Sequence, residues 1–258
     1  MEYANGILYN YCSHPKTAKI HVQLHCHNRF ELLYLTGGEM EHVVEDRKYR
    51  VKAGDLILVR PSMYHYLNQC ADQPYVRYDI LFDPDRIGID LSMLPEEMEV
   101  VSLLNNPVAD GLFRKLNNYC EGLDEATFGK LLEQMIYELF LNLQLSTNTT
   151  HREKIFLSPI LTRALTYINE NLFTITDVEE IAQALYISPS NLYYLFRTSL
   201  HQTPKKYVTE KRLLAAQRKI FAGHKPTEVY KECGFRDYTT FFRSYTARFG
   251  RAPSDDSK

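Results

Sequence analysis

Two segments near the C-terminal end combine hydroxyl groups, aromatic rings and an arginine in a pattern that suits contact with DNA. In the first, Leu192, Leu195 and Phe196 recur at helical spacing, which predicts a buried helix face over residues 190–199. The opposite face of that helix then carries Ser190, Tyr193, Tyr194 and Arg197.

The second segment, residues 237–248, repeats this layout. Phe241 and Tyr245 predict its inner face, and the outer face carries Tyr238, Thr239, Phe242, Arg243 and Thr246. Arginine can bind O6 and N7 of a guanine together, and Tyr or Thr can reach phosphates or the thymine methyl group. Such helices are typical of elements that lie in a major groove, although a solvated helical bundle would carry similar residues.

The charge distribution favours the DNA interpretation. Residues 1–150 hold 13 Lys+Arg against 21 Asp+Glu, a balance of −8, whereas residues 151–258 hold 17 against 11, a balance of +6. A basic half joined to an acidic half indicates that only the basic half meets a polyanion. Basic residues near the two segments are expected to contact the DNA backbone: Lys205, Lys206, Lys211, Arg212 and Arg248.

Short helices must position these two faces. A capping box at Thr176–Glu179 predicts a helix to Ala184, and a turn at 185–187 leads to Ser188-Pro189, a favoured helix start. In the second unit, residues 227–232 precede a turn with Gly234 and the apolar Phe235. Each pair of helices is a helix-turn-helix unit, and a long amphipathic helix from Pro204 to about Ala222 joins the two.

In the N-terminal half of the chain the apolar residues recur with a different spacing. Short apolar or alternating runs separated by turn residues predict a β-barrel or a β-sandwich; the runs are Ile20–Leu24, Phe30–Leu35, Met40–Val44, Tyr49–Val51, Leu56–Val59 and Val76–Phe82. Near residues 125–145 an apolar helix face follows, which either packs wholly within its own domain or also contacts a second copy. The polar stretch from Ser146 predicts a linker. We therefore expect an α+β chain with domains at 1–145 and 155–258 and a linker at 146–154.

Composition excludes several classes of protein. Hydrophobic residues make up 45% and charged residues 24%, which is typical of a globular chain. The start of the sequence has no secretory signal, and no apolar stretch predicts a membrane span. Five scattered cysteines argue against a disulfide framework, so we expect a cytoplasmic protein without membrane contact. No nucleophile elbow or Walker-type phosphate loop supports a hydrolase or nucleotidase.

From Ile155 to about Ser254 the sequence resembles the DNA-binding domain of AraC/XylS-type transcription regulators. The matching residues are Ile181-Ala182, Ile187-Ser188-Pro189-Ser190, Leu192, Leu195-Phe196-Arg197, Pro204, Tyr207, Arg212-Leu213, Ala216, Gly234-Phe235, Phe241, Arg243, Phe249-Gly250 and Pro253. The resemblance implies that two units enter successive major grooves of operator DNA, and that base contacts come from the outer faces predicted above. It also implies a homodimer formed through the N-terminal domain, and RNA polymerase as a further partner.

Three features depart from the family pattern. His201 stands where the family has a glycine after the first recognition helix, so its backbone is expected to be left-handed. Tyr230 replaces a small residue that packs against the second recognition helix, so its ring must swing out or the second unit must repack. The tail from Ser254 lacks the usual aromatic and basic ending.

The front half is similar to the cupin-like effector domain of the same family. The pattern is His25-x-His27, Glu31, Gly38, Gly54-Asp55, Pro61 and His65. The resemblance implies that His25, His27, Glu31 and His65 converge, to bind a metal ion in metal-dependent cupins or to hydrogen-bond a small effector here. Imidazole and carboxylate ligands suit zinc, iron, manganese or nickel.

We expect a regulator without a resident cofactor, whose effector is a small molecule such as a sugar. The residues expected to contact the effector are His25, His27, Glu31, Tyr34, His65 and Tyr78, with Tyr64 and Tyr66 as further stacking surfaces. The alternatives are a metal-dependent cupin enzyme with an accessory DNA-binding domain, and a constitutive DNA-binding protein whose barrel only dimerises.

Overall fold

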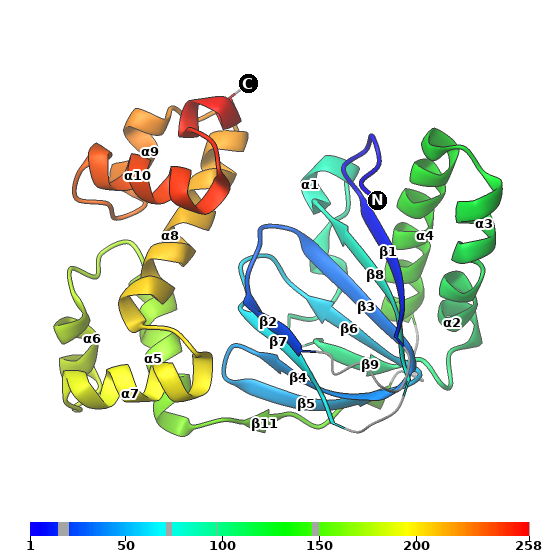
Figure 1. Cartoon of the computed structure of the whole chain (residues 1–258), viewed down its shortest axis with the longest axis horizontal. Coiled ribbons are helices and arrows are strands. Elements are labelled where there is room, and N and C mark those ends of the chain that lie inside the picture. Colours follow the sequence, from blue (N-terminus) through cyan, green and yellow to red (C-terminus); the bar gives the residue numbers. More distant parts are fainter. Residues whose placement is uncertain (15–20, 71–73, 97, 146–149, 258) are drawn as a thin grey trace. The chain divides into compact units, whose positions relative to one another are not determined.

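The computed structural model describes residues 1–14, 21–70, 74–96, 98–145 and 150–257. The chain divides into two compact units, Met1–Ile155 and Phe156–Lys258 (Figure 1). Within the described ranges, no helix has the length and apolar character needed to cross a membrane. The predicted linker residues 146–149 lie outside the described residues.

Unit 1 contains two antiparallel sheets. The first has the order β1 (Leu8–His14), β8 (Tyr75–Phe82), β3 (Phe30–Gly37), β6 (Asp55–Val59), β9 (Val100–Ser102) and β10 (Thr150–His151). The second has the order β11 (Ile155–Phe156), β5 (Arg47–Lys52), β4 (Glu39–Val44), β7 (His65–Gln69) and β2 (His21–His25). The two sheets share no strand among the described residues, so the domain is a sandwich of separate sheets rather than one closed barrel.

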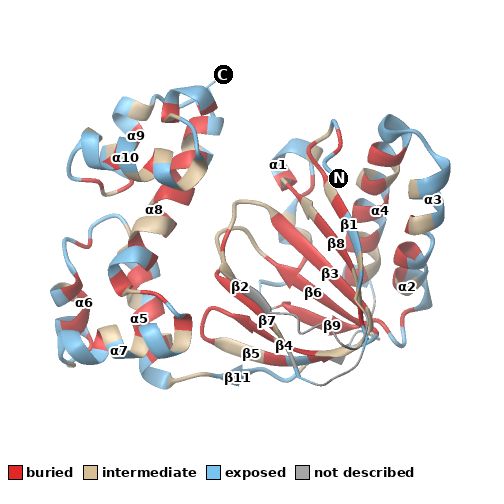
Figure 2. Cartoon of the chain, viewed as in Figure 1, coloured by how far each residue is buried: buried red, intermediate tan, exposed pale blue. Residues whose placement is uncertain are grey.

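The described part of each of the six predicted runs lies in a strand, but β1, β7, β9, β10 and β11 were not predicted. Alternation along β3 places its residues in two different cores. Phe30, Leu32 and Tyr34 face a core shared with the helices, whereas Leu33 and Leu35 face the second sheet. Figure 2 shows that β3, β6 and β8 are largely buried, whereas β11 is exposed.

Three helices cover one face of the first sheet: α2 (Pro107–Arg114), α3 (Leu116–Gly122) and α4 (Glu125–Leu145) (Figure 1). The predicted apolar face of α4, including Leu132, Ile136 and Phe140, is buried in the core of its own unit. The N-terminal segment also packs on α4, where Tyr3 meets the Phe128 ring. Two short helices, α1 (Pro84–Ile87) and η1 (Leu91–Met93), follow β8.

The end of the predicted linker lies against unit 1. Thr150 and His151 pair with β9, and Arg152 binds the carboxylate of Asp55 through two hydrogen bonds of 2.9 and 2.7 Å. Asp55 is fully buried, so Arg152 neutralises a carboxylate that water does not reach. The segment 150–152 is therefore held at one edge of the sandwich.

Apart from Phe156, the described residues of unit 2 lie in helices and in the loops before and between them. Its elements are α5 (Pro159–Glu170), α6 (Val178–Ala184), α7 (Pro189–Leu200), α8 (Pro204–Phe221), α9 (Pro226–Glu232), α10 (Tyr238–Phe249) and η2 (Pro253–Ser257). The two predicted helix-turn-helix units are α6–α7 and α9–α10, and α8 joins them (Figure 1). Ser188 caps α7 with Pro189 at its first position, as predicted. The capping box of α6 is shifted by one residue, because Asp177 accepts from Glu180 N while Glu180 accepts from Thr176 N.

The turns of the two units have the same hydrogen bonds. In the first, Ile187 N donates to Ala182 O at 3.0 Å; in the second, Phe235 N donates to Tyr230 O at 2.9 Å. The central residue of each turn, Tyr186 or Gly234, has a left-handed backbone. A Cβ on Gly234 would lie 2.6 Å from the Phe173 carbonyl oxygen, so only glycine fits there.

Candidate DNA interface and ligand-domain site

The outer face of α7 carries the predicted DNA-contacting residues. Leu192 and Phe196 are fully buried, and Leu195 is partly buried. Ser190 and Arg197 are exposed, Tyr194 is 70% exposed, and Tyr193 is half-buried. These four side chains therefore lie on the solvent side of α7, as the helical period predicts.

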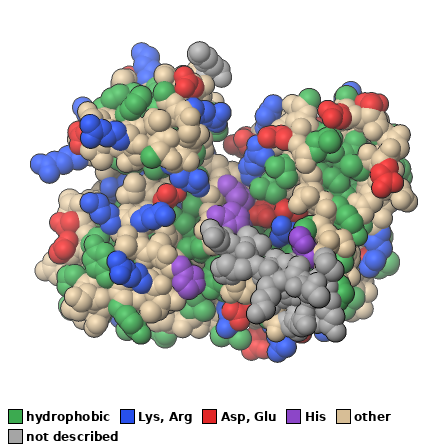
Figure 3. All heavy atoms as spheres, viewed as in Figure 1, with side chains coloured by type: hydrophobic (Ala, Val, Ile, Leu, Met, Phe, Trp, Pro, Cys, Tyr) green, Lys and Arg blue, Asp and Glu red, His purple; other side chains and the backbone are tan. Residues whose placement is uncertain are grey.

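The α10 helix repeats this division. Phe241 and Tyr245 are fully buried, whereas Thr239 and Arg243 are exposed and Phe242 is 39% exposed. Tyr238 is half-buried at the start of the helix. Both helices thus present hydroxyl, aromatic and guanidinium groups without an acidic residue within either helix. Figure 3 shows separate Lys and Arg side chains scattered over the visible face of this unit.

The basic residues predicted to hold the DNA backbone separate into two groups. Lys205 and Lys206 are exposed in the first turn of α8. Lys211 is buried, with its ammonium 5.4 Å from the centre of the Tyr207 ring. Arg248 forms an ion pair of 2.5 Å with Glu210. The prediction of phosphate contacts is therefore kept for Lys205 and Lys206 and withdrawn for the others, because internal contacts engage Lys211, Arg212 and Arg248.

Arg212 holds the two helix-turn-helix units together. Its guanidinium donates to Leu172 O at 2.7 Å and Ile175 O at 2.6 Å, both between α5 and α6. It also donates to Gly234 O at 2.7 Å in the turn of the second unit. A partly buried cation that satisfies three carbonyls fixes the spacing of the units along α8. Sequence reasoning missed this role because the direction of a side chain on a long helix depends on tertiary packing.

Tyr230 occupies, in the second unit, the place that Ala182 holds in the first. Its ring does not leave the core: it packs against the second-unit cluster, edge-on to Tyr238 at 5.6 Å and beside Phe241 at 6.4 Å. The second unit has therefore repacked around the larger ring. Tyr238, a predicted DNA contact, is held by that repacking.

The other two departures are also accommodated. His201 ends α7 with φ = 51°, the predicted left-handed conformation, and Gly250 ends α10 in the same way. In the tail, η2 folds back so that Asp256 is buried. Its carboxylate accepts hydrogen bonds from Tyr245 and Gln217 and pairs with Arg251. The buried carboxylate of Asp256 therefore holds the tail in place, where the family pattern has an aromatic and basic ending.

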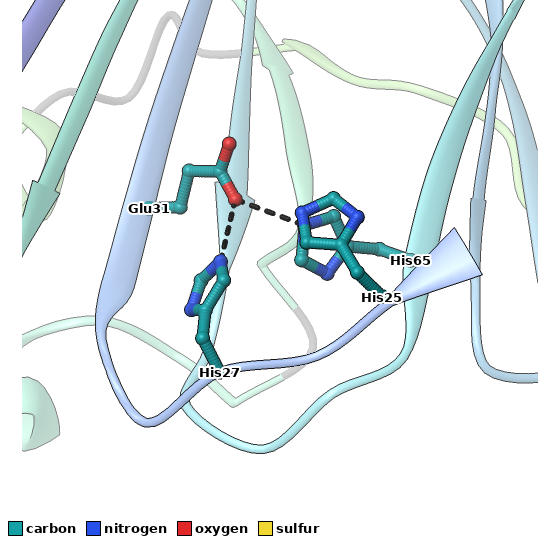
Figure 4. A group of neighbouring side chains, drawn as sticks. All are labelled: His25, His27, Glu31 and His65. Carbon is teal, nitrogen blue, oxygen red and sulfur yellow. Dashed lines mark hydrogen bonds and ion pairs between the residues drawn. The ribbon is translucent and has the colours of Figure 1, made fainter. Parts of the chain in front are cut away.

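In unit 1, three histidines and a glutamate converge between the sheets (Figure 4). His25 ends β2 and pairs across the strands with His65 at the start of β7, while Glu31 extends from β3. One ligand atom from each of His25, His27, Glu31 and His65 lies within 4.8 Å of all the others. Glu31 Oε2 is 3.0 Å from His27 Nε2 and 2.9 Å from His65 Nε2.

Burial and charge perturb this group strongly. Burial alone would raise the pKa of Glu31, but the facing imidazoles of His27 and His65 hold it well below its usual range. Burial, together with the Glu31 charge, raises the pKa of Asp79 to about 7. Burial lowers the pKa of His42 to about 3, so its imidazole is neutral at physiological pH. Neither ring nitrogen of His42 has a hydrogen-bond partner of normal geometry within the described part of the chain.

Tyr34 and Tyr78 do not join this group, contrary to the predicted effector set. Both lie in the core under the helices, where Tyr34 packs on Phe113 at 4.7 Å and donates to Asp110. Tyr34 is three residues from Glu31 on the same strand, so the two side chains point to opposite faces. A molecule between the sheets would meet the His/Glu group and not these two tyrosines. Tyr64 and Tyr66 are also buried, beside His65 in sequence.

Comparison with known proteins identifies the class. Residues 9–140 match the model of the AraC-like ligand binding domain, and residues 181–258 match a helix-turn-helix domain model. A ligand domain joined to tandem helix-turn-helix units defines a transcription regulator whose DNA binding a small molecule modulates. The chain belongs to the AraC family of these regulators.

Several curated proteins are similar over most of the chain. The lactose operon transcription activator of Staphylococcus xylosus is 23% identical over 86% of this chain and 81% of its own length. The raffinose operon regulator RafR of Pediococcus pentosaceus is 24% identical over 79% of this chain and 75% of its own length. The transcriptional activator RhaR of Salmonella arizonae is 25% identical over 89% of this chain and 85% of its own length.

Two solved structures are also similar. ToxT of Vibrio cholerae is similar over 99% of this chain and 98% of its own, with 12% identity and a TM-score of 0.44. An AraC-type regulator of Chromobacterium violaceum is similar over 38% of this chain and 89% of its own, with 27% identity and a TM-score of 0.36.

Proposed function

We propose that this regulator reads its operator with the exposed faces of α7 and α10 and activates transcription when a sugar binds in unit 1. The observation that carries the proposal is the matched pair of exposed faces. The proposed base contacts are Ser190, Tyr193, Tyr194, Arg197, Tyr238, Thr239, Phe242 and Arg243. All eight lie on the solvent side of their helix or at its start. Lys205 and Lys206 supply phosphate contacts.

The sugar effector is supported by the relatives, two of which carry the names of lactose and raffinose operons. Hydroxyl groups of a sugar suit a site that offers imidazole and carboxylate partners, as His25, His27, Glu31 and His65 do. The sugar shifts the regulator only through a difference in its affinity for two conformations. Activation is proposed to involve contact with RNA polymerase next to the operator.

A homodimer through unit 1 is part of the proposal. The apolar face of α4 is occupied within its own unit, so we propose that the dimer uses the outer side of this helix, where Tyr137 is 50% exposed. Two copies would present four helix-turn-helix units to two half-sites, and the linked units raise each other's effective concentration. Sedimentation of the whole chain at micromolar concentration should give a dimer, and Tyr137→Glu should give a monomer. A wild-type monomer would reject this part.

Because the protein acts on DNA and all five cysteines are free thiols, the proposed location is the cytoplasm. The test of function is anisotropy of labelled DNA from upstream of its own gene, with a panel of lactose, raffinose and monosaccharides. We expect one sugar class to change the operator Kd and none to change binding to random DNA. Operator affinity that no sugar changes would support a constitutive DNA-binding protein instead.

A further inference from the structure

We propose that the turns of the two helix-turn-helix units contact the phosphate backbone of the DNA, through the Tyr186 hydroxyl in the first unit and the Arg236 guanidinium in the second. Both residues precede the recognition helices, so neither belongs to the helix faces that are proposed to read bases. The inference rests on the proposed function only in taking α7 and α10 as the helices that enter the major grooves.

The side chain of Tyr186 lies almost entirely in solvent. At 92% exposure it is the most exposed of the large apolar side chains in the described ranges. A tyrosine ring stabilises a fold mainly by removing apolar surface from water. A ring left in water contributes little to the stability of its own unit, so the structure of the unit does not account for this residue.

The backbone of Tyr186 is also unfavourable for tyrosine. Its φ is 58°, a left-handed conformation that residues with a bulky side chain adopt rarely. Glu45 and Ser62 also have positive φ, but each uses its side chain in a hydrogen bond within unit 1. The exposed ring of Tyr186 gives the fold no comparable support, so the strained tyrosine indicates a function outside the chain.

The position of Tyr186 identifies the partner. It lies four residues before Ser190, and Ser188, Pro189 and Ser190 are all exposed, so the turn is continuous with the proposed DNA interface. The N-terminal residues of a recognition helix contact base edges in a groove about 12 Å wide, which phosphates border on both sides. A side chain in the turn at that end therefore meets the backbone rather than the bases. The tyrosine hydroxyl can donate a hydrogen bond to a phosphate oxygen.

The second unit carries a different side chain in the equivalent turn. Its left-handed residue is Gly234, and one residue more than in the first unit separates it from the cap of α10. The additional residue is Arg236, which is exposed and whose guanidinium suits a phosphate. The neighbouring acid, Asp237, is occupied as the cap, because its carboxylate accepts from Thr240 N at 2.8 Å and from the Thr240 hydroxyl at 2.9 Å. Each turn therefore presents one long, exposed side chain that ends in a hydrogen-bond donor.

The test is the anisotropy of labelled DNA with the full-length protein, on DNA from upstream of its own gene and on random DNA, at three salt concentrations. Tyr186→Phe keeps the ring and removes the hydroxyl, so it should weaken binding to both DNAs by the same factor, about three- to tenfold. Because the hydroxyl carries no charge, the slope of log K against log salt should not change. Arg236→Gln should reduce that slope by about 0.9 on both DNAs, because it removes one charged phosphate contact.

A matched pair of glycine variants separates the contact from the backbone conformation. Tyr186→Gly and His201→Gly each remove an exposed side chain from a left-handed residue, one before α7 and one after it. Glycine adopts this conformation readily, so both variants should fold, which thermal unfolding will verify. Tyr186→Gly should weaken DNA binding at least as much as Tyr186→Phe does, whereas His201→Gly should bind as the wild type does.

Wild-type affinity of Tyr186→Phe would overturn the contact in the first unit; if activation of transcription were lost at the same time, the turn would instead contact a protein. A loss confined to the upstream DNA would also reject it, because that result would show a base contact. An equal loss in His201→Gly would attribute the effect to the backbone. An unchanged salt slope for Arg236→Gln would overturn the contact in the second unit.

Binding to random DNA separates the failure of this inference from the failure of the proposed function. A wild type that never prefers the upstream DNA, with variants that still lose affinity for random DNA as described, would reject operator reading and keep the turn contacts. A wild type that prefers the upstream DNA, with variants that bind as it does, would reject the turn contacts alone.

Discussion

Replacing Arg212 with methionine should destabilise the DNA-binding unit without removing a DNA contact. Methionine keeps much of the apolar stem and deletes the guanidinium that donates to Leu172 O, Ile175 O and Gly234 O. The charge distribution predicted that Arg212 contacts the DNA backbone, whereas these three hydrogen bonds hold its guanidinium inside the unit. The Arg212→Met variant should therefore have a lower free energy of unfolding but should keep its DNA contacts.

The magnitude follows from the three bonds. A hydrogen bond from a charged group contributes about 1.5–3 kcal/mol, so three of them set an upper limit of about 9 kcal/mol. Desolvation of the guanidinium offsets part of this gain, and water can approach the partly exposed Leu172 and Gly234 once the cation is gone. We expect a net loss of about 3–4 kcal/mol in the free energy of unfolding. For a unit of this size, about 3 kcal/mol lowers Tm by about 12–24 °C.

The assay combines thermal unfolding with operator binding at several salt concentrations, and Lys206→Met is the matched control. Lys206 is exposed, so its variant should unfold as the wild type does. If Lys206 contacts one phosphate, its loss should reduce the slope of log K against log salt by about 0.9. Arg212→Met, measured at a temperature where it is folded, should keep the wild-type slope. An unchanged Tm with a reduced slope for Arg212→Met would refute the internal role.

Three other substitutions test the interface. Arg243→Ala should cost about 1–3 kcal/mol on the operator and relax preference at one base pair, as gel-shift competition with point-changed operators will show; an equal loss on random DNA would indicate a phosphate contact. Tyr230→Ala should weaken operator binding, because Tyr238 would lose the ring that it packs against. Tyr230→Phe keeps that ring and should bind the operator as the wild type does. Equal operator affinities of the two variants in an anisotropy assay would contradict the packing role. Asp256→Asn should lower the free energy of unfolding by about 2 kcal/mol, while the exposed Asp255→Asn should change it by less than about 0.5 kcal/mol; matching melting curves would argue against a buried anchor.

The helices of the DNA-binding unit could be predicted from the sequence because their signals are local. Ser188-Pro189 marks the start of α7, and Gly234 marks a turn that tolerates no Cβ. The start of α6 was misplaced by one residue because Thr176 and Asp177 are both good caps, and only the folded geometry selects Asp177.

The strands were less predictable because their partners are distant in sequence. Strand β7 begins at His65 and is defined by pairing with β2 and β4 rather than by an apolar run. Strand β1 mixes Tyr and Cys with polar residues and is defined by its pairing with β8. The sequence did carry the signal that separates Tyr34 from Glu31, because residues three apart on one strand point to opposite faces of the sheet.

The roles of the basic residues on α8 also could not be predicted from the sequence, because they depend on tertiary packing. Lys206 and Arg212 are both basic residues of α8, and the sequence predicted the same contact with the DNA backbone for each. In the structure Lys206 faces solvent, whereas Arg212 donates to three carbonyl oxygens. The convergence of His25, His27, Glu31 and His65 was implied by resemblance alone, since no sequence spacing measures the distance across a sandwich. The structure adds that one ligand atom from each of these four side chains lies within 4.8 Å of all the others.

The most direct test of the account is binding of the full-length protein to DNA from upstream of its own gene, at two salt concentrations and against random competitor. The account predicts preferential binding that weakens as salt rises and that is lost when Tyr194 and Arg243 are both replaced by alanine. Binding that never discriminates between this DNA and random sequence, with every sugar of the panel present in turn, would contradict it.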